Sequence, residues 1–318
     1  MPITWRNFAD WAKRRPAVLR AADRLGRTRG RLRVLDRIAP PPPAPMRPDL
    51  GNWDRCRLAA AWIGHATVLL RVGKMTVLTD PVFSERIGLG LGLMTLGPRR
   101  RFAPAIALRD LPPVDLILVS HAHFDHLDRP TLVRLAKSIP VLTSEHNGDL
   151  VRDLGFRKVR ELRLPQDLTR LSGERVRIGG VTVTARRVPH WAPRMFHDTH
   201  RGYCAFLLEA GDCRVLFGGD SAGGDHFADL GGIDLAILGI GGYDPYLAAH
   251  ATPEQAWQMF RQMRGRALLP IHHGTFRLSH EPIDEPLHRL LACAGGQAEQ
   301  IVVRRIGQSW FDPTPPGG

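Results

Sequence analysis

The feature that most constrains this chain is a cluster of metal-ligand side chains directly after an apolar run. Residues 114–128 read VDLILVSHAHFDHLD. Four ligand-type side chains within six residues would lose hydration without compensation if they were buried unpaired, and a bound metal removes that cost. The pattern therefore predicts a strand that delivers His121, His123, Asp125 and His126 to a metal centre.

The spacing within this cluster indicates that one loop feeds two metals. In an extended segment His121 and His123 share a face, whereas Asp125 and His126 face elsewhere if the chain turns into a helix there. Imidazole suits zinc and neighbouring transition metals, and the carboxylate adds charge neutralisation. We therefore expect two divalent metal ions, with zinc as the first choice and iron or manganese as alternatives.

Three further candidate ligands each follow an apolar run, where an α/β scaffold presents its chemistry. They are His190 after 181–188, Asp220 after 213–219 and His272 after 267–271. Each signal is weak alone, since an Asp after two glycines is common in turns. Together with the cluster after residue 120, they predict two sets of three ligands and a bridging carboxylate.

Short β-like and helix-like runs recur after residue 57 and predict the fold class. The β-like runs are 59–64, 67–72, 75–79, 114–120, 175–187, 203–209, 213–218 and 234–240. The helix-like runs are 131–137, 148–154, 253–263 and 286–294. Because strands occur in both halves, with helices between the later ones, we expect an α/β (α+β) fold in the form of a four-layer αββα sandwich.

The ordered pattern HxHxDH, His, Asp, His resembles the metallo-β-lactamase superfamily. Several segments are similar, within it, to N-acyl-phosphatidylethanolamine-hydrolysing phospholipase D and its bacterial relatives. These segments are WIGHATVL at 62–69, LTDPVFS at 78–84, HW at 190–191, GDS at 219–221, IHHGTF at 271–276, and His250 followed by TPEQA at 252–256. The resemblance spans residues 57–280 and implies two metals held between paired αββα halves.

The resemblance also implies a role for each candidate ligand. One metal is bound by His121, His123 and His190, the other by Asp125, His126 and His272, and Asp220 bridges them. His250 lies near the site without being a ligand, and assists catalysis or contacts the scissile group. Asp125, Asp220 and His250 are therefore the catalytic candidates.

Departures from the family pattern concern the substrate pocket. His273 stands where the family has an aromatic residue, and Val188-Pro189 before His190 departs from the usual Pro-x-x-His spacing. Asp220 stands where the β-lactam-hydrolysing branch often has a cysteine, which disfavours that activity.

Three more residues are candidates for supporting roles around the ligands. His65 and Asp80 are candidates to orient ligand imidazoles, which need a partner for their second nitrogen. An ordinary role in satisfying buried backbone groups is the alternative for both. Tyr243 is a candidate for the mouth of the site.

Two adjacent divalent metals predict hydrolysis through a metal-bridging hydroxide. His250 is expected to protonate the leaving alkoxide. The resemblance, and the basic N-terminal segment together with Arg99, Arg100 and Arg101, favour an N-acyl-phosphatidylethanolamine-like glycerophospholipid as substrate, which makes the chain a phosphodiesterase of phospholipase D type. A lactone or carboxyl ester is the second choice. A nuclease is third, because the sequence holds no additional nucleic-acid module. A non-catalytic metal-binding protein would be expected to have lost ligands, and none is missing.

The net charge of +13 is concentrated near the N-terminus. Residues 1–49 hold twelve Lys and Arg against four Asp, a net charge of +8 that leaves +5 for the rest. Trp5, Phe8 and Trp11 lie there at near-helical spacing, so the segment is interpreted either as a helix on an anionic membrane surface or as a helix docked on its own domain. Prolines at 40–48 predict a semi-rigid linker, which divides the chain into an arm at 1–49 and a catalytic domain at 50–318.

Other sequence features favour a cytoplasmic protein, with peripheral contact to the inner membrane face as a further hypothesis. The N-terminal region lacks the apolar stretch of a signal peptide, and the four cysteines form no CxxC pair. The oligomeric state stays open.

The Gly-rich segment 83–101 is interpreted as a lid or substrate-contacting loop, with a buried irregular connection as the alternative.

Overall fold

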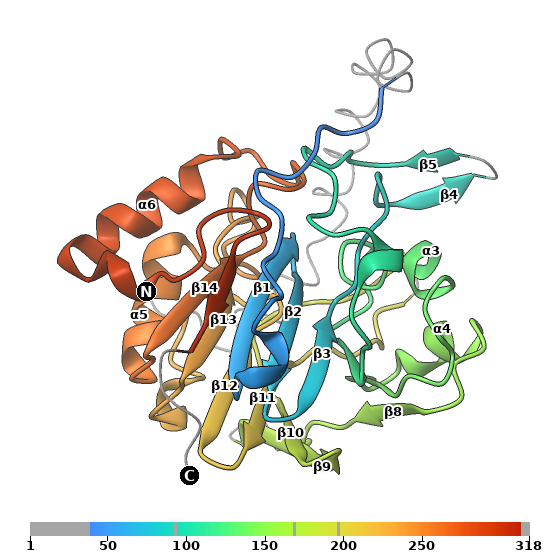
Figure 1. The fold of residues 1–318 in the computed structure, drawn as a ribbon, viewed down its shortest axis with the longest axis horizontal. Coiled ribbons are helices and arrows are strands. Elements are labelled where there is room, and N and C mark those ends of the chain that lie inside the picture. Colours follow the sequence, from blue (N-terminus) through green and yellow to red (C-terminus); the bar gives the residue numbers. More distant parts are fainter. Residues whose placement is uncertain (1–38, 92–93, 168–169, 196–197, 313–318) are drawn as a thin grey trace.

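The computed structural model describes residues 39–91, 94–167, 170–195 and 198–312. Two large sheets face each other, and helices cover the outer face of each (Figure 1). The order across the molecule is helices α5 and α6, the second sheet, the first sheet, then helices α3 and α4. The predicted four-layer αββα sandwich is therefore confirmed. Residues 1–38, with Trp5, Phe8 and Trp11, lie outside the described part of the chain.

The first sheet has the strand order β15-β1-β2-β3-β6-β7-β8. Its strands are β1 (Leu58–Gly64), β2 (Thr67–Val72), β3 (Met75–Thr79), β6 (Leu116–Val119), β7 (Val141–Ser144), β8 (Val159–Leu162) and β15 (Ser309–Phe311). Strands β3, β6, β7 and β8 run parallel, so the loops that follow them leave at the same end of the sheet.

The second sheet has the order β14-β13-β12-β11-β10-β9. Its strands are β9 (Ser172–Ile178), β10 (Val181–Arg186), β11 (Ala205–Ala210), β12 (Cys213–Phe217), β13 (Leu235–Gly239) and β14 (Ala267–Ile271). Strands β12, β13 and β14 are parallel. The loops that carry Asp220 and His272 therefore also leave at one common end.

Short helices complete the layers. The α-helices are α3 (Arg129–Leu132), α4 (Gly148–Arg152), α5 (Pro253–Gln262) and α6 (Glu285–Ala294). The 3-10 helices are η2 (Trp53–Arg55), η3 (Leu108–Asp110), η4 (Ala228–Leu230) and η5 (Gly295–Gln300). No helix in the described ranges is long and apolar enough to cross a membrane.

Strand β1 shows why the sheets stack as they do. Its side chains alternate between two cores: Trp62 packs between the two sheets, while Ile63 packs under α3 and α4. Every residue of β1 is buried, because both faces of the first sheet are covered. The sequence of such a strand is a continuous apolar run, and does not alternate between apolar and polar residues.

Helix α5 begins with a capping box. The Thr252 hydroxyl accepts from the Gln255 N–H, and the Gln255 side chain accepts from the Thr252 N–H. Two helix-end donors are satisfied in this way, and Pro253 occupies the first helical position, where no N–H is needed. The start of α5 is thus fixed three residues after His250.

The predicted single strand over 175–187 is wrong, because this segment belongs to two antiparallel strands. Strands β9 and β10 pair from Val181 with Ile178 onwards. Between them Gly179 and Gly180 both have positive φ, 53° and 89°. A Gly-Gly pair supplies the left-handed backbone that a tight hairpin needs, and this signal outweighs the continuity of the apolar pattern.

The Gly-rich segment 83–101 contains a hairpin of β4 (Leu89–Leu91) and β5 (Met94–Leu96) that projects from the body of the molecule (Figure 1). Leu89 and Leu96 are 39% and 51% exposed. At its base the buried Arg100 donates to the carbonyls of Val82, Ser84 and Phe102. The segment is therefore an anchored hairpin rather than an irregular connection, and contact with substrate stays a prediction.

The proline-rich segment lies on the surface of the domain. The Met46 N–H donates to Ile306 O at 3.1 Å, and the Ala103 N–H donates to Pro42 O at 2.7 Å. Ala44 packs against the core between the sheets. Residues 39–48 are therefore attached to the folded body along their length.

Candidate metal centre

The loop after β6 turns back on itself and gathers four polar side chains. The N–H groups of His126 and Leu127 both donate to His123 O, at 3.1 and 2.9 Å. The loop starts from Ser120, whose N–H donates to the buried Asp80 Oδ1 at 2.7 Å. This turn directs the predicted ligands toward the gap between the two sheets.

A first set of ligand atoms consists of His121, His123, His190 and Asp220. Their candidate donor atoms all lie within 4.8 Å of one another. His121 Nε2 is 2.9 Å from His123 Nδ1, and His190 comes from the segment that follows β10 in the other sheet. The set therefore spans both halves of the sandwich, as the sequence predicts.

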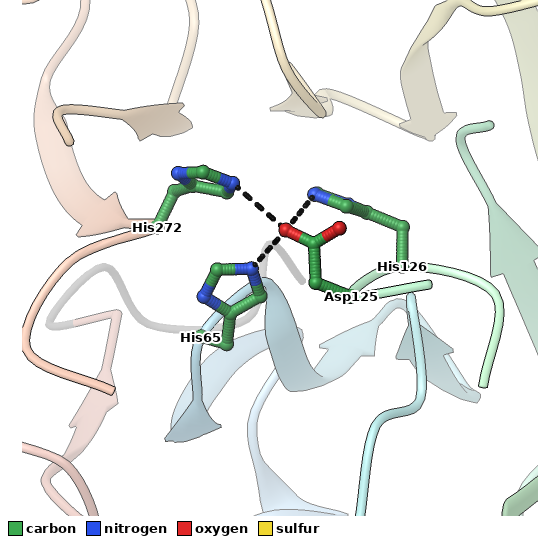
Figure 2. Close-up of side chains that lie close together, drawn as sticks. All are labelled: His65, Asp125, His126 and His272. Carbon is green, nitrogen blue, oxygen red and sulfur yellow. Dashed lines mark hydrogen bonds and ion pairs between the residues drawn. The ribbon is translucent and has the colours of Figure 1, made fainter. Parts of the chain in front are cut away.

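A second set surrounds the carboxylate of Asp125, as Figure 2 shows. Asp125 Oδ2 lies 2.9 Å from His65 Nε2, 3.3 Å from His272 Nε2 and 3.5 Å from His126 Nε2. The three imidazole nitrogens converge on one oxygen atom. The sequence left the role of His65 open, and the structure places its imidazole inside this cluster.

Asp220 lies where the two sets meet. Its Oδ2 atom is 3.2 Å from the Nε2 atoms of His126 and His272. It is 3.8 Å from three further ring nitrogens, His121 Nε2, His190 Nε2 and His250 Nδ1. One carboxylate oxygen thus faces five imidazoles, which is the position that a bridging ligand requires. The assignment of the seven residues to two metals stays a prediction.

A glycine lets the carboxylate of Asp220 approach so closely. Gly219 has φ +56°, and a Cβ atom there would lie 2.9 Å from Ser120 Cβ. A side chain at this position would separate the end of β12 from the end of β6. The Gly-Gly pair before Asp220 therefore brings the two sheet ends together.

The second nitrogen of several imidazoles is held by a partner. His126 Nδ1 donates to Asp80 Oδ2 at 2.6 Å, while Asp80 Oδ1 accepts from the Ser120 N–H, so Asp80 fills both of the roles that the sequence left open. The other partners are Ala249 O for His190 at 2.9 Å, Gly241 O for His272 at 3.2 Å and Ser120 Oγ for His121 at 2.9 Å. Each ring is thereby fixed with its other nitrogen directed into the cluster.

The atoms that face the centre fit bound cations. His126 Nε2, His190 Nε2 and both Asp220 oxygens are buried, and none has a hydrogen-bond partner among the described residues. Burying such groups unpaired costs free energy, whereas imidazole nitrogen and carboxylate oxygen are ordinary ligands of divalent transition metals. The residues present therefore fit two divalent cations.

Comparisons with known proteins agree with this geometry. Residues 75–273, which include all seven candidate ligands, match the family described as the beta-lactamase superfamily domain. The chain belongs to the metallo-β-lactamase superfamily.

Relatives within the superfamily cover most of the chain. An uncharacterised protein of Mycobacterium tuberculosis is 33% identical over 87% of this chain and 75% of its own length. N-acyl-phosphatidylethanolamine-hydrolyzing phospholipase D 1 of Caenorhabditis elegans is 31% identical over 80% of this chain and 75% of its own length. A possible metal-dependent hydrolase of Veillonella parvula has the same fold, with a TM-score of 0.64, 17% identity and coverage of 80% of this chain and 99% of that one.

Burial and neighbouring charges determine the pKa values of the candidate ligands in this metal centre. Burial lowers the pKa of His190 to about 3 and that of His123 to about 4, so both are neutral, as metal-binding imidazoles must be. Burial also opposes the charge on Asp220, but the positive charge of His126 and His272 outweighs it and holds the Asp220 pKa well below its usual range. The neighbouring charges therefore favour the ionised carboxylate of Asp220, the form that binds a cation.

His250 lies at the margin of the centre. Its Nδ1 atom, Asp220 and His272 form a third group of possible ligand atoms within 4.8 Å. Burial lowers the pKa of His250 to about 3. The structure therefore places His250 beside the bridging carboxylate, and whether it binds metal or only assists catalysis is a question for mutation.

Two residues singled out in the sequence lie away from the ligand atoms. The Tyr243 hydroxyl donates to Glu285 Oε1 at 2.9 Å, so it is directed toward α6, and its place at the mouth of the site stays a prediction. The His273 ring is buried and lies 4.7 Å from the ring of Trp62. Here the aromatic-like packing role of the family position is filled by an imidazole.

Proposed function

We propose that this metal-dependent hydrolase of the metallo-β-lactamase superfamily cleaves a phosphodiester, and that its substrate is an N-acyl-phosphatidylethanolamine-like glycerophospholipid. The observation that carries the proposal is the position of Asp220 Oδ2 between the two ligand sets, 3.2 Å from His126 and His272 and 3.8 Å from His121 and His190. Support for the substrate class comes from the similarity to the Caenorhabditis elegans phospholipase D.

The bound metals, which we propose are two zinc ions, would supply a water of lowered pKa as nucleophile and positive charge for the developing anion. The chain's own contribution is to hold the ligands in place before substrate arrives. Asp80 fixes the ring of His126, and Ala249 O fixes that of His190. Because these partners are already in position, little rearrangement opposes the reaction.

His250 is the proposed proton donor for the leaving group. In the step, the oxygen of water bonds to phosphorus and the bond from phosphorus to the leaving alkoxide breaks. Because burial lowers the pKa of His250 to about 3, its imidazole is neutral before the step. Beside Asp220, it takes up the proton that the water loses and gives a proton to the alkoxide oxygen.

A parallel substrate screen tests the proposal. The purified full chain, with its metal content measured, is assayed on bis(p-nitrophenyl) phosphate, N-acyl-phosphatidylethanolamine vesicles, a lactone panel and single-stranded DNA. We expect turnover of the small diester and release of the N-acylethanolamine from the vesicles. Turnover of lactones without the diester would favour the carboxyl-ester alternative, and turnover of DNA alone would favour a nuclease.

We further propose that residues 1–38 of the N-terminal arm bind an anionic membrane surface. Residues 1–38 hold eleven Lys and Arg against three Asp, a net charge of +8, together with Trp5, Phe8 and Trp11. Basic and aromatic residues in one segment supply both components of interfacial binding.

Deleting residues 1–38 separates docking from chemistry. The cut is placed before residue 39 because residues 39–48 contact the domain. We expect weaker, less salt-sensitive sedimentation with anionic vesicles and lower activity on lipid, with unchanged turnover of the soluble diester. Equal, salt-insensitive sedimentation of both proteins would overturn the membrane role, and an insoluble truncated chain would show that the arm docks on its own domain.

A further inference from the structure

Glu281 is a buried carboxylate outside both ligand sets. It follows β14 in the chain and is 8% exposed. Oε1 accepts from the Gly242 N–H at 2.6 Å and from the Ser279 hydroxyl at 2.6 Å, and Oε2 accepts from the Asp244 N–H at 3.1 Å. All three partners are donors, as an ionised carboxylate requires. The loop after β13 is thereby tied to the loop after β14.

A single peptide unit connects this carboxylate to a candidate ligand. The N–H of the Gly241–Gly242 peptide donates to Glu281, while its carbonyl oxygen accepts from His272 Nδ1 at 3.2 Å. Hydrogen bonds in such a chain polarise one another, so the negative charge of Glu281 makes Gly241 O a stronger acceptor. The carboxylate therefore acts on the His272 ring through the peptide.

The same peptide lies directly against two imidazoles of the centre. A Cβ atom on Gly242 would lie 3.1 Å from His272 Cε1 and 3.2 Å from His250 Nδ1, and Gly242 has φ +85°. A Cβ atom on Gly241 would lie 2.4 Å from His272 O. Only glycine fits at these positions, and any shift of the loop would move both rings.

The backbone conformation of His272 explains why contacts from other residues are needed to keep its ring in place. His272 has φ +61°, in the left-handed region that a non-glycine residue rarely adopts. Its N–H donates to His65 O at 3.2 Å. Strained residues persist only where the surrounding structure fixes them, and here the contacts come from His65 on one side and from the Gly241–Gly242 peptide on the other.

We infer that Glu281 is a positioning residue for the second metal, acting through the Gly241–Gly242 peptide to direct His272 Nε2 toward Asp125 and Asp220. The inference rests on the metal centre of the proposed function. Carboxylates that orient a ligating histidine usually contact its ring directly, and in this chain a peptide unit lies between them. Glu281 itself contacts no reacting atom.

Zinc titration of the full-length, metal-free protein against a competing chromophoric chelator tests this role. The variants are Glu281→Ala, which removes the acceptor, and Glu281→Gln, which keeps an acceptor oxygen but removes the charge. We expect Glu281→Ala to weaken one of two zinc sites by about 10–100-fold and to spare the other, with a smaller loss in Glu281→Gln.

Glu285→Gln is the matched control. Glu285 accepts from the Tyr243 hydroxyl and from Arg289, so it contacts the same loop without reaching the Gly241–Gly242 peptide. We expect this variant to keep both zinc affinities. As a second readout, the visible absorption of the cobalt-substituted protein should change for the weakened site alone, because it reports ligand geometry.

The outcomes separate this inference from the proposed substrate. Wild-type zinc affinities in folded Glu281→Ala, or in Glu281→Gln if the alanine variant does not fold, would overturn the positioning role. Equal weakening of both sites would also overturn it, because that pattern indicates general destabilisation. Wild-type protein that binds two zinc ions and cleaves no phosphodiester would refute the proposed function and leave the role of Glu281 intact.

Discussion

The two ligand sets meet at Asp220, yet they are supported by different kinds of group. In the first set, His121 contacts the Ser120 hydroxyl and His190 contacts a backbone carbonyl. In the second set, His126 contacts the carboxylate of Asp80. His272 contacts a peptide bound to a further carboxylate. The Ser120 hydroxyl in turn donates to Asp80 Oδ2 at 2.6 Å. Carboxylates therefore stand behind both of these rings in the second set, one of them in direct contact, whereas in the first set one ring has a carboxylate only beyond a hydroxyl and the other ring has a neutral carbonyl.

Because of this difference, the supporting groups are expected to act differently on metal binding in the two sets. A carboxylate behind an imidazole fixes its orientation and raises its basicity as a ligand, whereas a carbonyl mainly fixes its orientation. The second set also contains Asp125, which His65 contacts at 2.9 Å. We therefore expect the second metal to depend on charge and the first on the geometry of neutral imidazoles.

Removing the shared ligand should have the largest effect, because it damages both sets. We expect Asp220→Ala to lose both metals and all measurable hydrolase activity while it keeps its far-ultraviolet circular dichroism spectrum. Metal analysis after dialysis measures the first result. The control is Asp212→Asn, which removes an 82% exposed carboxylate that pairs with Arg57. Retention of both metals by Asp220→Ala would refute the bridging role.

Removing one ligand from each set tests whether the sets are separate. We expect His190→Ala and His272→Ala each to lose one metal and to retain the other, because the two residues lie in different groups of ligand atoms. Activity should fall to background in both variants. Loss of two metals from each variant would show that the sets bind only as a unit, and the comparison between them would fail.

His250 lies outside both ligand sets as the sequence analysis assigns them. Its variant tests whether it takes part in metal binding. We expect His250→Ala to keep both metals and to lower kcat on the soluble diester by about 10²–10⁴-fold, the usual effect of losing a general acid. Metal content and kcat are measured on the same preparation. Loss of a metal would show instead that the group formed by Asp220, His250 and His272 is a binding site.

The smallest effects should come from the supporting groups, and these compare the two sets directly. We expect Asp80→Asn to weaken zinc binding by about 10–100-fold, since it removes the charge behind His126. Ser120→Ala should weaken binding less, because His121 loses a neutral partner. Zinc titration of both variants gives the comparison. A larger loss in Ser120→Ala would contradict the division into charged and neutral support.

Sequence reasoning located the candidate ligands because each follows a strand. The apolar run before Ser120 and the Gly-Gly pair before Asp220 are local signals, and the parallel strands bring their ends to one edge of each sheet. Local signals also gave helix α5, whose capping box and N-terminal proline are visible in the letters TPEQ. Residues at strand ends could therefore be grouped without a structure.

The contacts that support the candidate ligands could not be predicted from local sequence signals. Glu281 reaches Gly242 from another loop, and His65 reaches Asp125 across a separation of 60 residues. No periodicity or motif encodes which distant backbone group a buried carboxylate accepts from. Strands β7 and β8 were also missing from the prediction, because four residues each are too few to establish a pattern.

The pairing of β1 with β15 has a consequence for how the protein is made. Ala59, Ala60 and Ala61 pair with Phe311, Trp310 and Ser309, so one edge of β1 stays open until residues 309–311 have left the ribosome. The HxHxDH loop emerges long before His272, and in the interval its imidazoles lack the candidate ligands that follow later in the chain. An unpaired strand edge invites association with other chains. The complete ligand set therefore forms only after His272 has been synthesised, and the first sheet closes only after residues 309–311 have followed.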